Sequence, residues 1–409
     1  MTLILRLAWR NLWRHPRRTL LTAAAIAFSA LLLVFMITIQ LGAYDLATDT
    51  ATRVFTGQIQ VQRTAYLDKP KMRTSIPGAE KLAGNLRTAT GLDAVAARAQ
   101  GFALATSGTR SYGVPVIGVE PAREPGVSTL PGLIKRGRYL KDVRANEAVI
   151  GARLAKNLRI EVGQELTLLG GGRDGSVAAT VVPVVGIFET GMPDLDRHLI
   201  QVPLGMFQEV FSMGDHAHVI VISGASLEKL ETLHQRVAGA LPADADLRVR
   251  GWPELIPGLK QLIEADTVQN WFTYIVLIVV VTLSILNTFL MSVLERTREF
   301  GILLALGATP RRIGGMVLLE SFLLTAIGLL VGVVLGYLVA LYFQRYGFTF
   351  PGMKELHAQF GLPGVIHPKI TLVSLTLGPL VILLFTLLAA LYPATRLRRL
   401  DPVEAMHRI

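Results

Sequence analysis

Two short stretches of the chain have residue types and spacings that could support chemistry. Gly170–Ser176 reads GGGRDGS, and glycine-rich loops of this kind can hold phosphates with their backbone N–H groups. The stretch lacks the lysine of a GxxxxGK phosphate loop and lies between two strand-like segments, so we interpret it as a hairpin turn. His216 and His218 are two residues apart without a cluster of further ligands, which favours a strand or surface pair over a zinc site.

The sequence lacks the signatures of common hydrolases. It contains no HExxH and no GxSxG segment, the motifs of zinc peptidases and α/β-hydrolases. It has no cysteine, which excludes disulfides, thiol catalysis and cysteine-based metal sites. We therefore predict no catalytic, cofactor-binding or metal-binding residues in this chain, and we expect a non-catalytic subunit.

The composition instead predicts an integral membrane protein. Of the 409 residues 51% are hydrophobic, and the mean hydropathy is +0.46, which is too apolar for an ordinary soluble protein. Four nearly uncharged runs are long enough to cross a bilayer, which takes about 20 residues; they are 19–44, 268–294, 313–344 and 370–393. The first is too long for a signal-peptide core and predicts a retained anchor. The scarcity of ionisable groups in the spans argues against a proton-coupled carrier or an ion channel.

The net charge of +11 is concentrated beside these spans. Segments 1–18, 295–312 and 394–409 together hold 13 basic residues and only four acidic ones. The positive-inside rule predicts that all three are cytoplasmic, with the last forming a tail. A pI near 10 is also typical of proteins that bind nucleic acid, but the position of the charge favours a membrane topology, and we expect no nucleic-acid partner.

Residues 45–267 follow the first span and predict a soluble α+β domain on the outer side of the membrane. Period-two alternation predicts strands at Gln58–Arg63, Tyr112–Val119, Glu165–Leu169, Ala178–Ile187, Val219–Ser223 and Asp246–Trp252. Helical patterns occur at Ala79–Thr88, Gly151–Leu158 and Ser226–Leu241. The irregular interleaving predicts two lobes, with an exposed loop at Glu189–Asp194. A helical stripe over residues 253–270 predicts a stem that leads into the second span, and residues 345–369 are expected to form a short periplasmic loop.

Three features inside or beside the spans have alternative interpretations. Gly328, Gly332 and Gly336 are spaced by four, which favours close packing of another helix over ordinary glycine usage. Glu320 lies near the proposed cytoplasmic end of the third span; a snorkelling or first-turn residue is slightly preferred to a transport relay. Pro379 predicts a kink in the fourth span.

The N-terminal segment 1–18 mixes leucine and tryptophan with arginine. This pattern predicts a basic amphipathic helix at the cytoplasmic surface, with its tryptophans at headgroup depth. The helix could be an interfacial anchor, an elbow that transmits movement, or both.

The charged connector between the second and third spans resembles a known family signature. Arg296–Ile313 reads RTREFGILLALGATPRRI, and Leu391–Arg408 reads LYPATRLRRLDPVEAMHR. Both closely resemble segments of FtsX/MacB/LolC-type ABC transporter permeases, also called type VII or mechanotransmission transporters, and Val114–Leu168 resembles their MacB-like periplasmic core domain. With no fused nucleotide-binding domain, the chain is most similar to stand-alone LolC/LolE-like subunits.

The resemblance implies a permease that works in the bacterial inner membrane with a separate cytoplasmic ABC ATPase of the LolD/MacB kind. ATP and Mg²⁺ would bind that partner, and none would bind this chain. The resemblance further implies a second permease subunit, as homodimer or heterodimer, and a possible periplasmic carrier or adaptor. Segment 295–312 would be the coupling helix that docks on the ATPase, through Arg298, Glu299, Gly301, Ile302, Leu303, Ala305, Leu306, Gly307 and Ala308.

The leading hypothesis is extraction or export of a lipoprotein, lipid or other amphiphile, driven by the partner ATPase. The alternative is an FtsX-like scaffold that activates a periplasmic enzyme without transport; substrate-stimulated ATPase activity would distinguish the two. An enzyme active site outside the membrane has no residues to support it. The candidate substrate contacts lie at the outer ends of the first two spans, although lipid contact or packing explains them equally well; they are Phe35, Met36, Ile39, Trp271, Phe272 and Ile275.

Overall fold

The structure, a computed structural model of the chain, describes all residues except 1, 225, 243–244, 350–364 and 397–409. The chain divides into two units. Of the described residues, one contains 2–44, Ile263–Thr349 and 365–396, and the other contains those of Asp45–Leu262. Most of the predicted loop 345–369 and of the tail 394–409 therefore lies outside the described residues, as does most of the second family signature.

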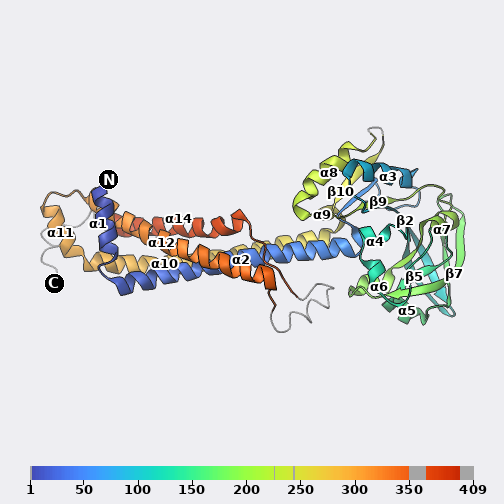
Figure 1. The fold of residues 1–409 in the computed structure, drawn as a ribbon, viewed down its shortest axis with the longest axis horizontal. Coiled ribbons are helices and arrows are strands. Elements are labelled where there is room, and N and C mark those ends of the chain that lie inside the picture. Colours follow the sequence, from blue (N-terminus) through green and yellow to red (C-terminus); the bar gives the residue numbers. More distant parts are fainter. Residues whose placement is uncertain (1, 225, 243–244, 350–364, 397–409) are drawn as a thin grey trace. The chain divides into compact units, whose positions relative to one another are not determined.

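The first unit is helical. Its helices are α1 (Thr2–Leu12), α2 (Pro16–Ala51), α10 (Pro257–Glu295), α11 (Thr297–Ala305), α12 (Pro310–Tyr346) and α14 (Leu372–Arg396). Four of them, α2, α10, α12 and α14, are long and apolar enough to cross a membrane. The first three each contain one of the expected runs, and α14 begins two residues after the start of the fourth. They run side by side, while α1 and α11 lie at one end of the bundle (Figure 1). Helix α14 continues through Pro379.

The stem expected over residues 253–270 is two helices. The short α9 (Trp252–Leu255) ends at Ile256, whose backbone is not helical, and α10 begins at Pro257. Proline at the first position of α10 explains the break, since it starts a helix readily but cannot continue one.

The second unit contains two lobes that share one strand. The first lobe has the order β1 (Ile59–Arg63), α3 (Ala79–Thr90), β2 (Val95–Ser107), β9 (Val219–Ile222), α8 (Leu230–Gly239) and β10 (Leu247–Gly251). The strands lie in the spatial order β10-β1-β9-β2, with every neighbouring pair antiparallel. This is a split βαβ arrangement of the ferredoxin-like kind.

The second lobe is inserted between β2 and β9. Its strands are β3 (Arg110–Val119), β4 (Ile134–Gly137), β5 (Ala148–Gly151), β6 (Glu165–Gly171), β7 (Val177–Phe188) and β8 (Ile200–Pro203). Because β6 pairs with both β2 and β7, strands β2-β3-β8-β5-β7-β6 close into a six-stranded barrel. The short helices α4 (Glu124–Val127), α5 (Ala152–Leu158), α6 (Pro193–His198) and α7 (Leu204–Val210) connect these strands.

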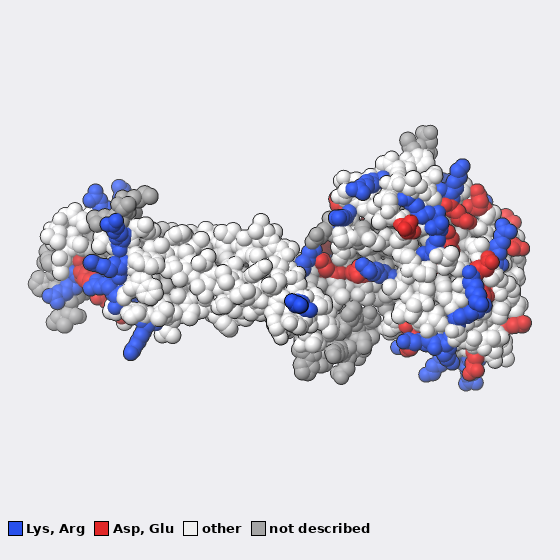
Figure 2. Space-filling view, viewed as in Figure 1, with Lys and Arg blue, Asp and Glu red and all other residues white. Residues whose placement is uncertain are grey.

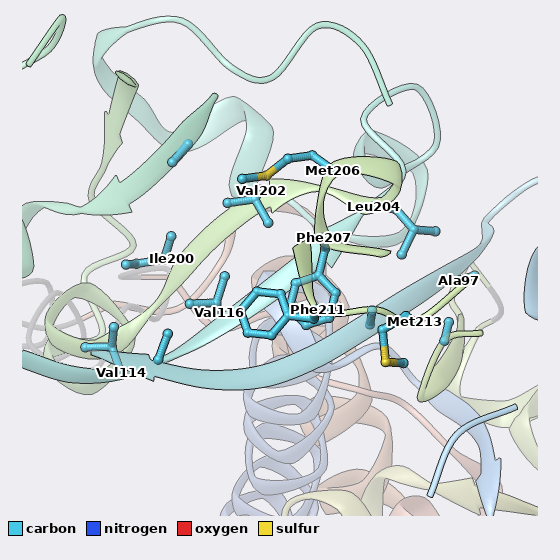
Figure 3. Packing of buried hydrophobic residues seen from close by; sticks show 14 of the residues in the cluster. Ala97, Val114, Val116, Ile200, Val202, Leu204, Met206, Phe207, Phe211 and Met213 are labelled. Atoms are coloured by element: carbon cyan, nitrogen blue, oxygen red, sulfur yellow. The ribbon is translucent and has the colours of Figure 1, made fainter. Parts of the chain in front are cut away.

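The core of this lobe is built around two stacked phenylalanines. The rings of Phe207 and Phe211 lie 4.3 Å apart at 14°, among the aliphatic side chains of β3 and β8 (Figure 3). A Cβ at Gly118 would lie 2.6 Å from the Cβ of Phe207. Glycine at this strand position therefore leaves the space that the phenylalanine fills.

The predicted fold class, a four-span membrane protein with a two-lobed α+β domain, is confirmed. Gly170–Ser176 lies in the β6–β7 hairpin as expected, with the Gly172 N–H donating to the Ser176 carbonyl. The loop prediction for Glu189–Asp194 is partly wrong, because α6 begins at Pro193. Proline at the first helical position and acidic residues in the first turn favour a helix start there.

Candidate functional site

The connector between the second and third spans forms a short helix, α11, bounded by two breaks. Arg296 separates it from α10, with φ −101° and ψ 11°. At its other end Gly307 has φ +92°, and its N–H donates to the Leu304 carbonyl. Glycine adopts this left-handed conformation without strain, and Pro310 then starts α12. The local sequence thus explains both the end of α11 and the turn that follows it.

Helix α11 has one buried and one exposed side. Phe300 is 1% exposed and packs with Val293, Ile313, Met316 and Val317. On the other side Ile302, Leu303 and Leu306 are 47%, 38% and 79% exposed.

The nine residues expected to dock a partner divide between these two sides. Gly301 is buried with Phe300, and Glu299 and Ala308 are half-buried. The exposed ones are Arg298, Ile302, Leu303, Ala305, Leu306 and Gly307. Most of the expected surface therefore faces away from the bundle, whereas Gly301 supports the packing beneath it.

A partly buried ion pair anchors the start of α11 to the third span. The guanidinium of Arg296 lies 3.0 Å from a carboxylate oxygen of Glu320, and each side chain is 13% exposed. The side-chain amide of Asn11 in α1 donates to the same carboxylate at 2.7 Å. Glu320, for which snorkelling and a transport relay were the alternatives, thus has partners from two other segments. Pairing removes most of the cost of an acid in an apolar span.

Two further ion pairs join the N-terminal arginines to the same region. Arg14 donates to Glu299 at 2.9 Å, and Arg18 pairs with Glu295 at 2.5 Å. Burial opposes the ionisation of Glu299, but hydrogen bonding to Arg296 and the charges of Arg14 and Arg296 outweigh it and lower its pKa. A cavity of about 70 Å³ lies among these side chains. Many of the charges of this unit gather at the end that carries α1 and α11, whereas the middle of the bundle is almost free of charge on the face that Figure 2 shows.

Sequence reasoning missed this network, although a signal was present. Residues 1–18 contain five arginines and no acid, while Glu295, Glu299 and Glu320 lie near the ends of the second and third spans. If these ends share one side of the membrane, the charges are at similar depth and can pair. The sequence alone did not show which arginine meets which glutamate.

The glycines of the third span lie against α2. A Cβ at Gly328 would lie 2.8 Å from the Cβ of Ile26, and one at Gly332 only 2.4 Å from the Ala27 carbonyl oxygen. At Gly336 the nearest atom would be the Cβ of Val34, at 3.0 Å. A larger residue at Gly332 cannot be accommodated without moving the backbone of α2.

The six candidate substrate contacts have different surroundings. The ring of Phe35 packs against Phe343 and Phe348, with centroids 5.5 and 5.8 Å away, and Met36 packs against the core of the bundle. Ile39 is half-buried. The three residues of α10 are more open: Trp271, Phe272 and Ile275 are 46%, 70% and 53% exposed.

A hydrogen-bonded cluster joins α2 to α10 near these residues. The hydroxyl of Tyr44 donates to Asp266 at 2.6 Å and accepts from the Gln40 amide, also at 2.6 Å. The hydroxyl of Tyr274 donates to the Gln40 side-chain oxygen at 2.5 Å. These contacts hold the first two spans together at the end where both helices continue toward the second unit in sequence.

Within the second unit, a buried arginine binds the segment that follows α2. Residues Thr52–Thr56 form a π-helical turn, and the guanidinium of Arg98 donates to the Phe55 carbonyl at 2.5 Å. Arg98 also forms a bidentate pair with Glu124, with exposures of 1% and 0%. The same guanidinium lies 4.6 Å from the centre of the Phe55 ring. The turn that follows α2 is therefore fixed to β2 by a charged group that is fully shielded from solvent.

The histidine pair has a structural environment. His218 is fully buried, accepts from the Gln100 N–H at 2.8 Å and stacks on Tyr66. Its burial lowers its pKa to about 4. Among the described residues there is no cluster of three side chains that could hold a metal ion.

Comparison with known proteins matches most of the chain to two family models. Residues 19–239 match the MacB-like periplasmic core domain, and residues 271–402 match the FtsX-like permease C-terminal family. The chain is 26% identical over 234 residues to the uncharacterised ABC transporter permease YknZ of Bacillus subtilis, covering 55% of this chain and 54% of YknZ.

Two other proteins are also similar. The lipoprotein-releasing system transmembrane protein LolC of Neisseria meningitidis is 23% identical over 77% of this chain and 78% of LolC. The crystal structure of the periplasmic region of MacB from Actinobacillus actinomycetemcomitans has a TM-score of 0.37 at 16% identity, covering 52% of this chain and 94% of that region.

Proposed function

The chain belongs to the FtsX/MacB/LolC family of ABC transporter permeases, and from this premise we propose that it couples ATP hydrolysis on a separate ATPase subunit to movement of its extracytoplasmic domain. The spans and the core-domain family already make it a membrane protein with a domain outside the membrane. The coupling step, the partner and the substrate belong to the proposal.

The exposed apolar side of α11 carries the proposal. Ile302, Leu303 and Leu306 are exposed on α11, which lies at one end of the bundle (Figure 1), where headgroups and water leave large aliphatic side chains without an apolar environment. Exposed apolar patches rimmed by polar residues mark interaction sites. We assign this surface, with Arg298 at its rim, to the ATPase, and the end of the membrane that carries it to the cytoplasm.

Contacts within each unit support transmission of a movement that begins at α11. The Arg296–Glu320 pair and the Arg14–Glu299 pair attach α11 to α12 and to the N-terminal segment, so α11 cannot shift without displacing them. Tyr44 and Asp266 join the first two spans, and Arg98 binds the turn at the end of α2. The force would pass along α2 and α10.

The substrate that we propose is a lipoprotein, a lipid or another amphiphile in the outer leaflet of the bacterial inner membrane. The apolar character of the spans supports this, because they offer no row of charges along which a hydrophilic substrate could cross. The similarity to LolC points the same way. The working unit would be a dimer of permease subunits with two ATPase subunits, and a periplasmic carrier or adaptor could accept the substrate.

Charge substitution on α11 tests the proposal. We expect Leu306→Glu and Leu303→Glu to abolish binding of the ATPase subunit and the permease-dependent part of its ATP turnover in nanodiscs. Leu67→Glu is a matched control, because Leu67 is as exposed as Leu303, at 38%, but lies in the second unit. Normal recruitment and turnover with both α11 variants would disprove the assignment.

A further inference from the structure

Helix α1 has a surface that neither the bundle nor the network of ion pairs uses. Its inner side is packed: Ala8 is 0% and Leu12 7% exposed. Its outer side carries Leu5 and Trp9, and Trp13 follows directly after the last residue of the helix; these three side chains are 48%, 49% and 47% exposed. These three follow one another at a spacing of four, and the two indole rings meet edge to face at 6.2 Å. They therefore form one continuous apolar ridge.

Two arginines flank this ridge. Arg6 and Arg10 each follow a ridge residue in sequence, which places them in a second row beside it on the exposed side of the helix. Among the described residues neither has an acidic partner, in contrast to Arg14 and Arg18, which pair with Glu299 and Glu295. Two fixed positive charges thus remain next to an aromatic ridge.

The position of α1 identifies the occupant of this surface. The helix ends four residues before the first span, α2, and lies across the end of the helical bundle (Figure 1). Tryptophan is enriched at the boundary between headgroups and acyl chains, and arginine forms bidentate hydrogen bonds with phosphate. A zwitterionic headgroup would satisfy the tryptophans but would leave the net positive charge uncompensated.

We propose that Arg6 and Arg10 bind the headgroups of anionic phospholipids, with Trp9 and Trp13 inserted at the level of the glycerol backbone. The site does not depend on the proposed function, since it needs neither ATPase nor substrate. The proposed lipid site lies on the outer side of α1. On the inner side of the same helix, the Asn11 amide donates a hydrogen bond to Glu320.

Fluorescence quenching by brominated lipids tests this directly. The full chain with Trp252→Phe and Trp271→Phe retains only Trp9 and Trp13 and is placed in nanodiscs of phosphatidylcholine and phosphatidylglycerol. At equal mole fraction, we expect brominated phosphatidylglycerol to quench at least about two-fold more than brominated phosphatidylcholine. Added salt should reduce the difference.

Substitution of the arginines separates a specific site from general attraction. Arg6→Gln with Arg10→Gln should make the two lipids quench equally, while Arg345→Gln, which removes an exposed arginine at the other end of α12, should leave the preference intact. Equal quenching in the parent protein would overturn the proposal and point to an acidic protein surface as the occupant. A preference that survives loss of both arginines would overturn it as well.

Discussion

Arg296 and Glu320 meet at 3.0 Å where the second span turns into α11 and the third span begins. Arg296 is the one residue between α10 and α11, so its side chain fixes the direction in which α11 leaves the bundle. Removing Arg296 leaves the carboxylate of Glu320 with only the Asn11 amide, and removing Glu320 leaves Arg296 with only the more exposed Glu299.

We predict that this pair contributes measurably to the stability of the helical unit. Arg296→Gln and Glu320→Gln should each lower the free energy of unfolding by about 1–3 kcal/mol, and the double variant should lose less than the sum. A coupling energy of about 1 kcal/mol is expected from the double-mutant cycle, measured by thermal unfolding in detergent. Arg298→Gln is the control, because Arg298 is exposed; strictly additive losses would contradict the pairing.

The Arg98–Glu124 pair should be more costly to break, since both side chains are fully buried. Arg98→Met leaves an uncompensated carboxylate and should destabilise the second unit by about 3–5 kcal/mol. Combining it with Glu124→Leu should recover part of this loss, because no charge then remains buried. Asp49→Asn, which removes an exposed ion pair with Arg53, should change stability by less than about 1 kcal/mol. Equal effects of Arg98→Met and Asp49→Asn would be inconsistent with the burial of Arg98.

His218 predicts a dependence of stability on pH. Burial lowers its pKa from 6.5 to about 4, so the unfolded chain binds a proton there more readily than the folded chain does. The stabilisation is complete above pH 6.5 and is lost as the pH falls toward 4, by up to about 3 kcal/mol. His218→Gln should flatten the curve of stability against pH in this window, whereas His198→Gln, at an exposed position, should not. Parallel curves for the parent protein and His218→Gln would show that the pH dependence of stability does not come from His218.

We predict that any side chain larger than hydrogen at Gly332 disrupts the packing of α12 on α2. Gly332→Val would place atoms against the Ala27 carbonyl, where even a Cβ lies at 2.4 Å, and should cost about 1–3 kcal/mol or prevent assembly of the bundle. Gly315→Val lies in the same helix with no atom within 4 Å of its Cβ. Thermal unfolding of the two variants separates steric overlap from the general effect of valine in a helix; similar losses would argue against close packing.

The four spans and most strands could be predicted because their signals are local. A run of some twenty apolar residues, or an alternation of apolar and polar residues, can be recognised without knowing which segments pack against it in space. Strand β2 escaped prediction because six of the eleven residues of Val95–Ala105 are alanine or glycine, which have low strand propensity. Its alanines are accommodated in the core of the unit. Strands β5 and β8 have only four residues, all buried, and therefore show no alternation.

The expected docking segment could be located in the sequence, but its supports could not. The identity of Arg296 was plain, yet its partner Glu320 lies 24 positions away and Asn11 lies more than 280 positions away. Nothing in the sequence around Arg98 indicates that it is buried, since arginine is rarely buried in a strand. Only the fold brings Glu124 and the Phe55 carbonyl to it. Pairings of this kind depend on the tertiary structure, whereas the amphipathic pattern of α11 can be recognised from the local sequence alone.

The thirteen residues of β2 belong to both lobes of the second unit. Val95–Arg98 pair with β9 in the split βαβ lobe, and Ala103–Thr106 pair with β6 in the barrel. Bending between the lobes would break backbone hydrogen bonds that no water could replace inside the core. The two lobes should therefore open as a single foldon, with amide exchange along β2 governed by one global free energy of unfolding.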